Sequence, residues 1–139
     1  MTRTFLAALA ALSTGCIVVD ADRHDPPPAN LPPYISWADA GCYWDPYGGD
    51  YVWSFEAEVD DPDGALDVSI VYADVYDDWT GEWIDGFELY PVEGITWYSD
   101  WWQVSTWLDC SYPYNVVEFV AYDVFDAWDA VDVYPWVSL

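Results

Sequence analysis

Apolar and polar residues alternate with a period of two through much of the chain after residue 33. In YVWSFEAEV (51–59) the apolar residues Trp53, Phe55, Ala57 and Val59 alternate with polar ones. The polar residues between them are Ser54, Glu56 and Glu58. Such alternation is typical of a strand that buries one face. Similar patterns over 66–76, 115–124 and 130–137 predict three further strands.

Weaker alternation predicts strands over 33–38, 82–91 and 95–104, which makes about seven in all. No segment has the 3.6-residue period of a helix. Gly, Pro and Asp separate the short strands, as in β-sandwiches and barrels, and a sandwich is favoured. The pattern therefore predicts an all-β domain over residues 34–139, built as a sandwich of antiparallel strands.

Several segments resemble the immunoglobulin-like or fibronectin type III-like modules of bacterial surface proteins. The resemblance covers about 33–137 and is carried by PPYI, AEVDDPDG, LDVSIVYADV and VVEFVAYDVFDAWDAVDVYP. It implies a single immunoglobulin-like β-sandwich of about seven antiparallel strands, and it implies fold more than function. VFDAWDA replaces the family's glycine-containing turn, so the loop between the last two strands departs from the family pattern.

The N-terminus has the parts of an export signal: Arg3, an apolar segment from Phe5 to Leu12, and small residues after it. LSTGC (12–16) resembles the lipobox of bacterial lipoproteins, although Ser13 stands where that family usually has leucine. The resemblance implies that residues 1–15 are removed as a signal peptide and that Cys16 carries a lipid. The alternative is an ordinary signal peptide with an incidental cysteine.

Residues 16–33 follow as a tether rich in Pro and Asp. An extended chain of this length holds a domain up to about 50 Å from a membrane surface. We therefore expect a cell-envelope protein whose membrane contact is the lipid on Cys16. Ile17 is not the Asp that retains some bacterial lipoproteins at the inner membrane, which favours the outer membrane.

The chain has three cysteines, and an odd number in an exported protein needs an explanation. If Cys16 is lipidated, Cys42 and Cys110 remain as a pair, in a compartment where disulfides persist. The cysteine count thus predicts a Cys42–Cys110 disulfide. Two separate reduced thiols are the alternative.

Charge is the most unusual feature of the composition. Three of the 26 acidic residues lie in the tether, which leaves 23 in residues 34–139, where there is no Lys, Arg or His. A nucleic-acid partner is excluded, because phosphate binding needs basic side chains. Catalysis by a Ser-His-Asp triad or by lysine is excluded for the same reason, and only paired carboxylates remain. We expect a non-catalytic surface interaction or structural module, with an envelope protein or a polysaccharide as partner.

Two acidic loops, DDPDG (60–64) and DVFDAWD (123–129), would lie at the same end of an immunoglobulin-like sandwich. Calcium takes six to eight oxygen ligands and is available outside the cell. A calcium site is therefore one hypothesis, and no other cofactor is expected. The competing interpretation is that these aspartates bond their own turns. The candidate ligands are Asp60, Asp61, Asp63, Asp123, Asp126 and Asp129.

The chain holds eleven Trp and twelve Tyr, more than one sandwich core needs. Four of these aromatic residues crowd one predicted strand: Trp97 and Trp101 on one face, Tyr98 and Trp102 on the other. Exposed rings of this kind stack on sugars, so a carbohydrate-binding module is the alternative function. The other interpretation is that one pair fills the core while the second shields the sheet.

Overall fold

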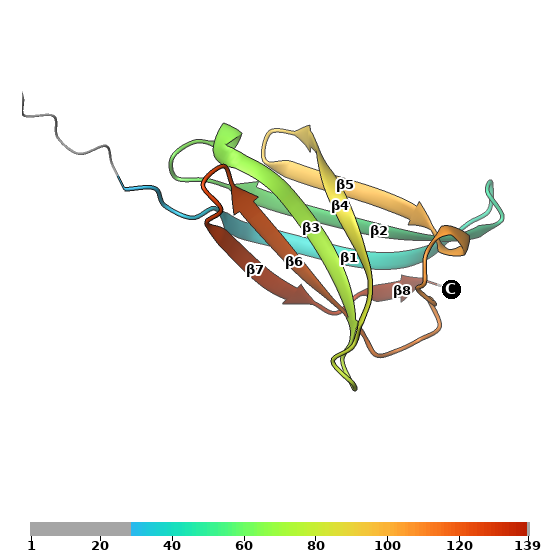
Figure 1. The fold of residues 1–139 in the computed structure, drawn as a ribbon. Coiled ribbons are helices and arrows are strands. Elements are labelled where there is room, and N and C mark those ends of the chain that lie inside the picture. Colours follow the sequence, from blue (N-terminus) through green and yellow to red (C-terminus); the bar gives the residue numbers. More distant parts are fainter. Residues whose placement is uncertain (1–28, 139) are drawn as a thin grey trace, which may run out of the picture.

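The computed structural model describes residues 29–138, and all its regular structure apart from two single 3-10 turns is β-strand (Figure 1). The predicted all-β class is confirmed. The strands form one curled sheet in the order β7-β6-β3-β4-β5-β2-β1-β8. Their bounds are β1 Tyr34–Asp45, β2 Asp50–Asp60, β3 Val68–Asp77, β4 Trp83–Glu93, β5 Thr96–Trp102, β6 Asn115–Asp123, β7 Trp128–Val133 and β8 Trp136–Ser138.

Strand β4 passes between two layers of the curled sheet. Its residues 83–89 pair with β3, and only residues 90–93 pair with β5. One layer therefore holds β8, β1, β2 and β5, and the other holds β4, β3, β6 and β7. The two layers meet again where β7 lies beside the start of β1, and there the Ile35 N–H donates to Asp129 Oδ2 over 2.9 Å.

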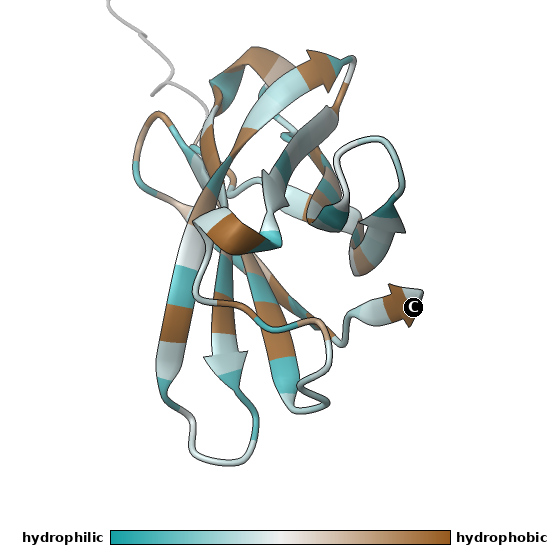
Figure 2. Cartoon of the chain, turned by 90° about the vertical axis from the view of Figure 1, so that its right-hand side faces the viewer, coloured by the Kyte–Doolittle hydropathy of each residue, from teal (hydrophilic) through white to brown (hydrophobic). Residues whose placement is uncertain are grey.

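The core lies between the two layers and follows the predicted alternation. Trp53 and Phe55 of β2 are fully buried, and Phe55 stacks on Phe87 of β4 with ring centroids 4.8 Å apart. Phe119 of β6 is buried in the opposite layer. Figure 2 shows the brown and teal bands that this alternation produces along the strands.

The C-terminal strand pattern over 130–137 is one strand in the prediction and two strands in the structure. Pro135 lies between β7 and β8, and its missing N–H cannot join a ladder. Beyond it, β8 pairs with β1 in parallel, with Trp136 beside Gly41. The Trp136 ring occupies the space that a side chain at position 41 would need. Residues 29–138 therefore form eight strands, one pair of them parallel, where the sequence predicts about seven antiparallel strands.

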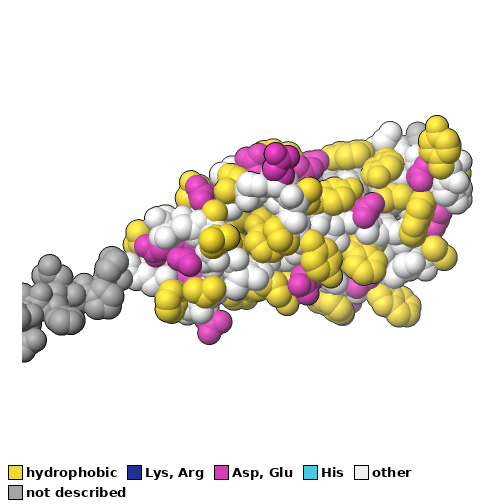
Figure 3. All heavy atoms as spheres, turned by 90° about the horizontal axis from the view of Figure 1, so that it is seen from above, with side chains coloured by type: hydrophobic (Ala, Val, Ile, Leu, Met, Phe, Trp, Pro, Cys, Tyr) yellow, Lys and Arg dark blue, Asp and Glu magenta, His cyan; other side chains and the backbone are white. Residues whose placement is uncertain are grey.

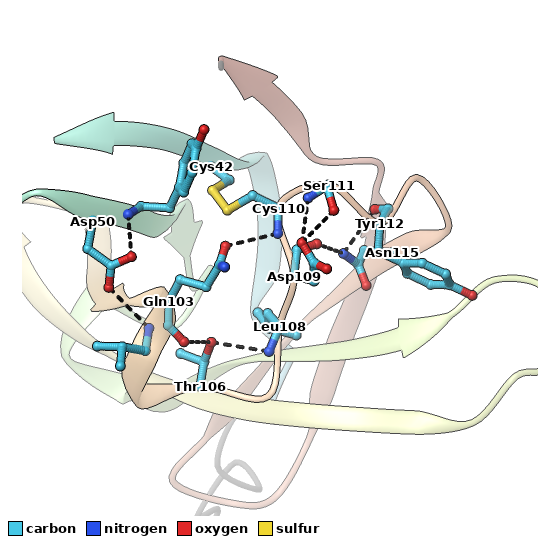
Figure 4. Close-up of a disulfide and its surroundings, with 12 residues drawn as sticks. Cys42, Asp50, Gln103, Thr106, Leu108, Asp109, Cys110, Ser111, Tyr112 and Asn115 are labelled. Carbon is cyan, nitrogen blue, oxygen red and sulfur yellow. Dashed lines mark hydrogen bonds between the residues drawn. A yellow bond between two sulfur atoms is a disulfide. The ribbon is translucent and has the colours of Figure 1, made fainter.

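A long loop between β5 and β6 covers one end of the core (Figure 4). Within it Leu108 and Cys110 are buried. Cys110 forms a disulfide with Cys42 of β1, as the cysteine count predicts, with the Cα atoms 5.8 Å apart. Within the loop, the Gln103 side chain accepts the Cys110 N–H at 3.0 Å. In residues 29–138 no helix has the length and apolar character that crossing a bilayer requires.

Candidate functional site

The two acidic loops lie side by side at the end of the domain where the tether enters. The Val124 N–H of the second loop donates to the Asp67 carbonyl that follows the first loop, over 2.9 Å. We call this end the aspartate pole; it holds the six candidate calcium ligands, Asp60, Asp61, Asp63, Asp123, Asp126 and Asp129.

Four of these carboxylates accept hydrogen bonds from the segment just before β1 and from the start of β1. The four donors come from residues 30–35, so this part of the chain is fastened to the pole. The bonds run from Asn30 Nδ2 to Asp123 (2.6 Å), from Leu31 N to Asp63 (2.7 Å), from Tyr34 Oη to Asp60 (3.3 Å) and from Ile35 N to Asp129 (2.9 Å).

Asp123 also organises the loop that follows it. Its Oδ1 accepts the N–H groups of Phe125 and Ala127 at 2.7 and 2.9 Å. Burial acts to raise the pKa of Asp123, but the hydrogen bonds from Asn30, Phe125 and Ala127 outweigh burial and lower the pKa. Asp126 supports the turn through its positive φ of 64°. This loop is thus held by its own backbone donors.

Asp61 is buried, and its Oδ1 accepts the Asp63 N–H at 2.8 Å while its Oδ2 has no partner. Across residues 29–138, no three His, Cys, Asp or Glu side chains are grouped so that they could hold a metal ion. The calcium site stays a prediction.

The aromatic strand β5 divides its rings between the two faces of the sheet. Trp97 and Trp101 pair with the core residues Ala57 and Trp53 of β2. Tyr98 and Trp102 lie on the other face, where Tyr98 pairs with Glu56 and Trp102 pairs with the buried Val52. Trp101 is 39% exposed and Trp102 is 40% exposed, so neither face carries a fully open platform. Use of these four rings for sugar stacking stays a prediction.

Two of the four β5 rings, those of Trp101 and Trp102, have specific partners in the protein. Trp101 packs against Phe87, and its indole N–H donates to Ser99 Oγ over 2.6 Å. The Trp102 ring lies over Gly48, where any side chain would collide with it. Burial, aided by nearby Asp100, Tyr43 and Glu56, raises the pKa of Tyr98 to about 12. Trp101 and Trp102 thus cover Phe87 and Gly48 of the same domain.

A second group of aromatic residues lies about 30 Å from the aspartate pole, at the far end of β3. The Trp79 and Tyr114 rings lie 6.4 Å apart, and the Tyr112 and Tyr114 rings lie 5.5 Å apart in an edge-to-face arrangement. Trp79 is 82% exposed. Tyr134, after β7, joins the group from a third loop. We call this group the aromatic tip; its members are Trp79, Tyr112, Tyr114 and Tyr134.

Hydrogen bonds to two aspartates at the end of β3 connect the aromatic tip. Tyr112 Oη donates to Asp77 Oδ2, and Tyr134 Oη donates to Asp78 Oδ2 at 3.4 Å. The Asp78 N–H donates to the Tyr114 carbonyl over 2.8 Å. Hydrogen bonds from Tyr112 and from turn N–H groups lower the pKa of Asp77, so it is ionised at neutral pH. The three loops thus hold one another in place.

Sequence reasoning missed the aromatic tip, because its members come from three turns that are far apart in the chain. The available signal was the position of Trp79 and Tyr114 in predicted turns. An aromatic residue in a turn cannot fill the core between two sheets, so it is a candidate for the surface.

Carboxylates also lie opposite one another on the outer face of the β4-β3-β6-β7 layer. Asp74 pairs with Glu118, and Glu118 pairs with Asp132. Burial and the two neighbouring carboxylates raise the pKa of Glu118. Asp74 also accepts the Trp83 indole N–H at 3.1 Å. Like charges in directly opposite positions destabilise a sheet, so this row costs folding free energy.

We expect Glu118→Gln to stabilise the domain by roughly 0.2–1 kcal/mol at pH 7. A raised pKa means that Glu118 contributes stability below its ordinary pKa, and this contribution is lost as the pH rises through the raised value. The glutamine resembles the protonated form, so its advantage should shrink from pH 7 to pH 5. Urea unfolding at both pH values measures it.

Glu88→Gln is the matched control for this experiment. Glu88 lies on the same outer face but opposite Tyr72 instead of a carboxylate. An equal gain from both variants would show that net charge, not the Asp74–Glu118–Asp132 row, sets the effect.

The chain matches no protein-family model, no curated protein and no solved structure. Its function must therefore be inferred from its own sequence and geometry.

Proposed function

We propose that this chain is a lipid-anchored protein of the cell envelope whose domain is a non-catalytic interaction module. The difference between the two ends of the domain is the observation that carries the proposal. Residues 30–35 are fastened at the aspartate pole, and the exposed aromatic tip lies at the opposite end of β3 (Figure 1). A domain tethered at one end and presenting aromatic loops at the other is suited to hold a partner away from the anchoring surface.

Strand connectivity supports an immunoglobulin-like sandwich within this proposal. Strands β1, β2 and β5 are neighbours in one layer, and β4, β3, β6 and β7 in the other. This is the division of first, second and fifth strands against third, sixth and seventh that characterises such sandwiches. The disulfide differs from the usual inter-sheet bridge, because it joins β1 to the β5–β6 loop.

Composition supports the non-catalytic part of the proposal. Residues 34–139 contain no His, Lys or Arg, so acid–base chemistry would have to rely on carboxylates alone. Four of the six carboxylates of the aspartate pole accept hydrogen bonds from residues 30–35. Figure 3 shows carboxylates in magenta dispersed among hydrophobic side chains in yellow on the face in view.

The lipid anchor rests on Cys16, which lies outside the described residues. With Cys42 and Cys110 joined in the structure, Cys16 is the remaining cysteine of the three. The outer membrane is the favoured location, because Ile17 follows it. The tether then emerges beside the aspartate pole, which would face the membrane.

Replacing Cys16 by serine in the full chain tests the anchor. Expressed in a Gram-negative host, the wild type should fractionate with membranes and enter the detergent phase. The Cys16→Ser variant should be absent from the membrane fraction and from the detergent phase. Non-reducing mass mapping should find Cys42 joined to Cys110 in both proteins, which excludes misfolding as the cause. Equal detergent partitioning of the two proteins would contradict the proposal.

A further inference from the structure

We propose that the aromatic tip is a docking surface for a basic partner, a protein segment that presents exposed Lys or Arg side chains. The inference rests on the proposed function as an interaction module and specifies the chemistry of its partner. Its basis is the combination of exposed rings, fixed carboxylates and a complete lack of basic residues in the domain.

The rings of the tip are exposed yet held in fixed positions. Trp79 is 82% exposed, and its ring makes a tilted contact with Tyr114 at a centroid distance of 6.4 Å. Tyr112 and Tyr134 are tied by their hydroxyl groups to neighbouring aspartates. Gly81, with a φ of 72°, closes the turn that presents Trp79, and the Asp77 carboxylate accepts the N–H groups of that turn. Rigid aromatic loops of this kind lose little conformational entropy when they bind.

Carboxylates lie close to these rings. Asp78 is exposed and accepts one hydrogen bond, from Tyr134. Asp109, at the base of the same loop cluster, accepts two bonds from Ser111, which lower its pKa and keep it ionised. An ammonium or guanidinium group gains from both partners, since it is attracted to the face of an aromatic ring and to a carboxylate.

Charge complementarity selects a basic partner over other kinds. The 23 acidic residues of residues 34–139 face no Lys, Arg or His in the same region, so the partner's cations meet no competing internal charge. The field of the domain attracts basic proteins over a distance and repels acidic ones. A neutral polysaccharide could stack on the rings but would gain nothing from this field.

The geometry also leaves the tip accessible. The bonds of residues 30–35 to the aspartate pole place the tether at the other end of β3. The β3–β4 turn and the β5–β6 loop therefore extend away from it (Figure 1). A partner held at the tip does not collide with the anchoring surface.

Binding of labelled peptides to the full chain in neutral detergent tests the inference. The probes are a ten-residue peptide of alternating Lys and Gly and its Glu-Gly counterpart, followed by fluorescence anisotropy at low salt. The Lys-Gly peptide should bind and the Glu-Gly peptide should not. Affinity should fall steeply as NaCl is raised. Absence of Lys-Gly binding to the wild type would overturn the inference.

Two double variants that leave the net charge unchanged distinguish peptide binding at the aromatic tip from binding through the overall charge of the domain. Trp79→Ala with Tyr114→Ala should weaken peptide binding at least tenfold. Phe125→Ala with Trp128→Ala removes two rings that are also exposed, at the aspartate pole, and should bind as the wild type does. Thermal unfolding of each variant confirms that it folds. Equal affinity of the two variants would show that net charge alone holds the peptide, and would overturn the inference.

A third variant and a sugar probe complete the test. Asp78→Asn keeps the backbone bond to Tyr114 and should weaken peptide binding several-fold, with a shallower salt dependence. Binding of a neutral hexasaccharide that depends on Trp79, without binding of the Lys-Gly peptide, would assign a polysaccharide partner and overturn the inference. If the Lys-Gly peptide does not bind but membrane anchoring still depends on Cys16, the basic partner is rejected and the proposed lipid anchor stands.

Discussion

Replacing Cys42 and Cys110 together by serine should lower the free energy of unfolding by about 4 kcal/mol. The disulfide joins residues 68 positions apart, so it removes much freedom from the unfolded chain. In the folded protein it fixes the β5–β6 loop over the core, where Leu108 is buried. For a domain of this size the melting temperature should fall by roughly 15 °C. Thermal and urea unfolding of both proteins measure the change.

Two comparisons make this result specific to the bridge. Reducing the wild type should reproduce the loss, and Cys16→Ser should leave the stability unchanged. A loss below about 1 kcal/mol would contradict the prediction. It would show that hydrogen bonds such as those from Cys110 to Gln103 and from Asn115 to the Asp109 carbonyl hold the loop without the disulfide.

Truncating Trp53 to alanine should cost about 3–5 kcal/mol. Trp53 is fully buried in β2, between Cys42 of β1 and Trp101 of β5. Its ring stacks beside Phe55 at a centroid distance of 6.2 Å. Alanine would leave a large cavity at the centre of this layer, next to the disulfide. The loss appears as a lower urea midpoint with an unchanged slope.

Two further tryptophan variants serve as controls for Trp53→Ala. The Trp53 indole N–H is buried without a partner, so Trp53→Phe removes an unpaired donor and should cost much less than Trp53→Ala. Trp79→Ala, at an exposed position of the aromatic tip, should change stability by less than about 0.5 kcal/mol. Similar losses at positions 53 and 79 would contradict the placement of the core.

Most strands could be predicted because their signal is local. Alternation in 51–59 or 115–124 reflects one buried face, and it can be seen without knowing the partner strand. The length of β1 could not be predicted in the same way. Its inward residues Ala38, Ala40 and Cys42 are small, so the alternation beyond residue 38 is weak, and pairing along all of β2 extends the strand.

The candidate sites show where local patterns stop being informative. The cysteine count predicts the disulfide, since only one pair remains after Cys16. The role of the aspartates depends on donors that are far away in the chain: Asp129 accepts the Ile35 N–H from a position 94 residues earlier. Local sequence patterns do not reveal those donors. The aromatic tip needs the fold for the same reason.

The fastening of residues 30–35 determines how the domain would respond to mechanical load between its tether and a partner held at the tip. Pulling on the tether loads the bonds to Asp123 and Asp63 first, and then the bond to Asp129 together with the start of the β1–β2 ladder. Peeling of β1 then proceeds only as far as Cys42, where a covalent bond carries the force to the β5–β6 loop. The chain would thus yield stepwise near the anchor until the force reaches Cys110, in the same loop that carries Tyr112 and Tyr114 of the aromatic tip.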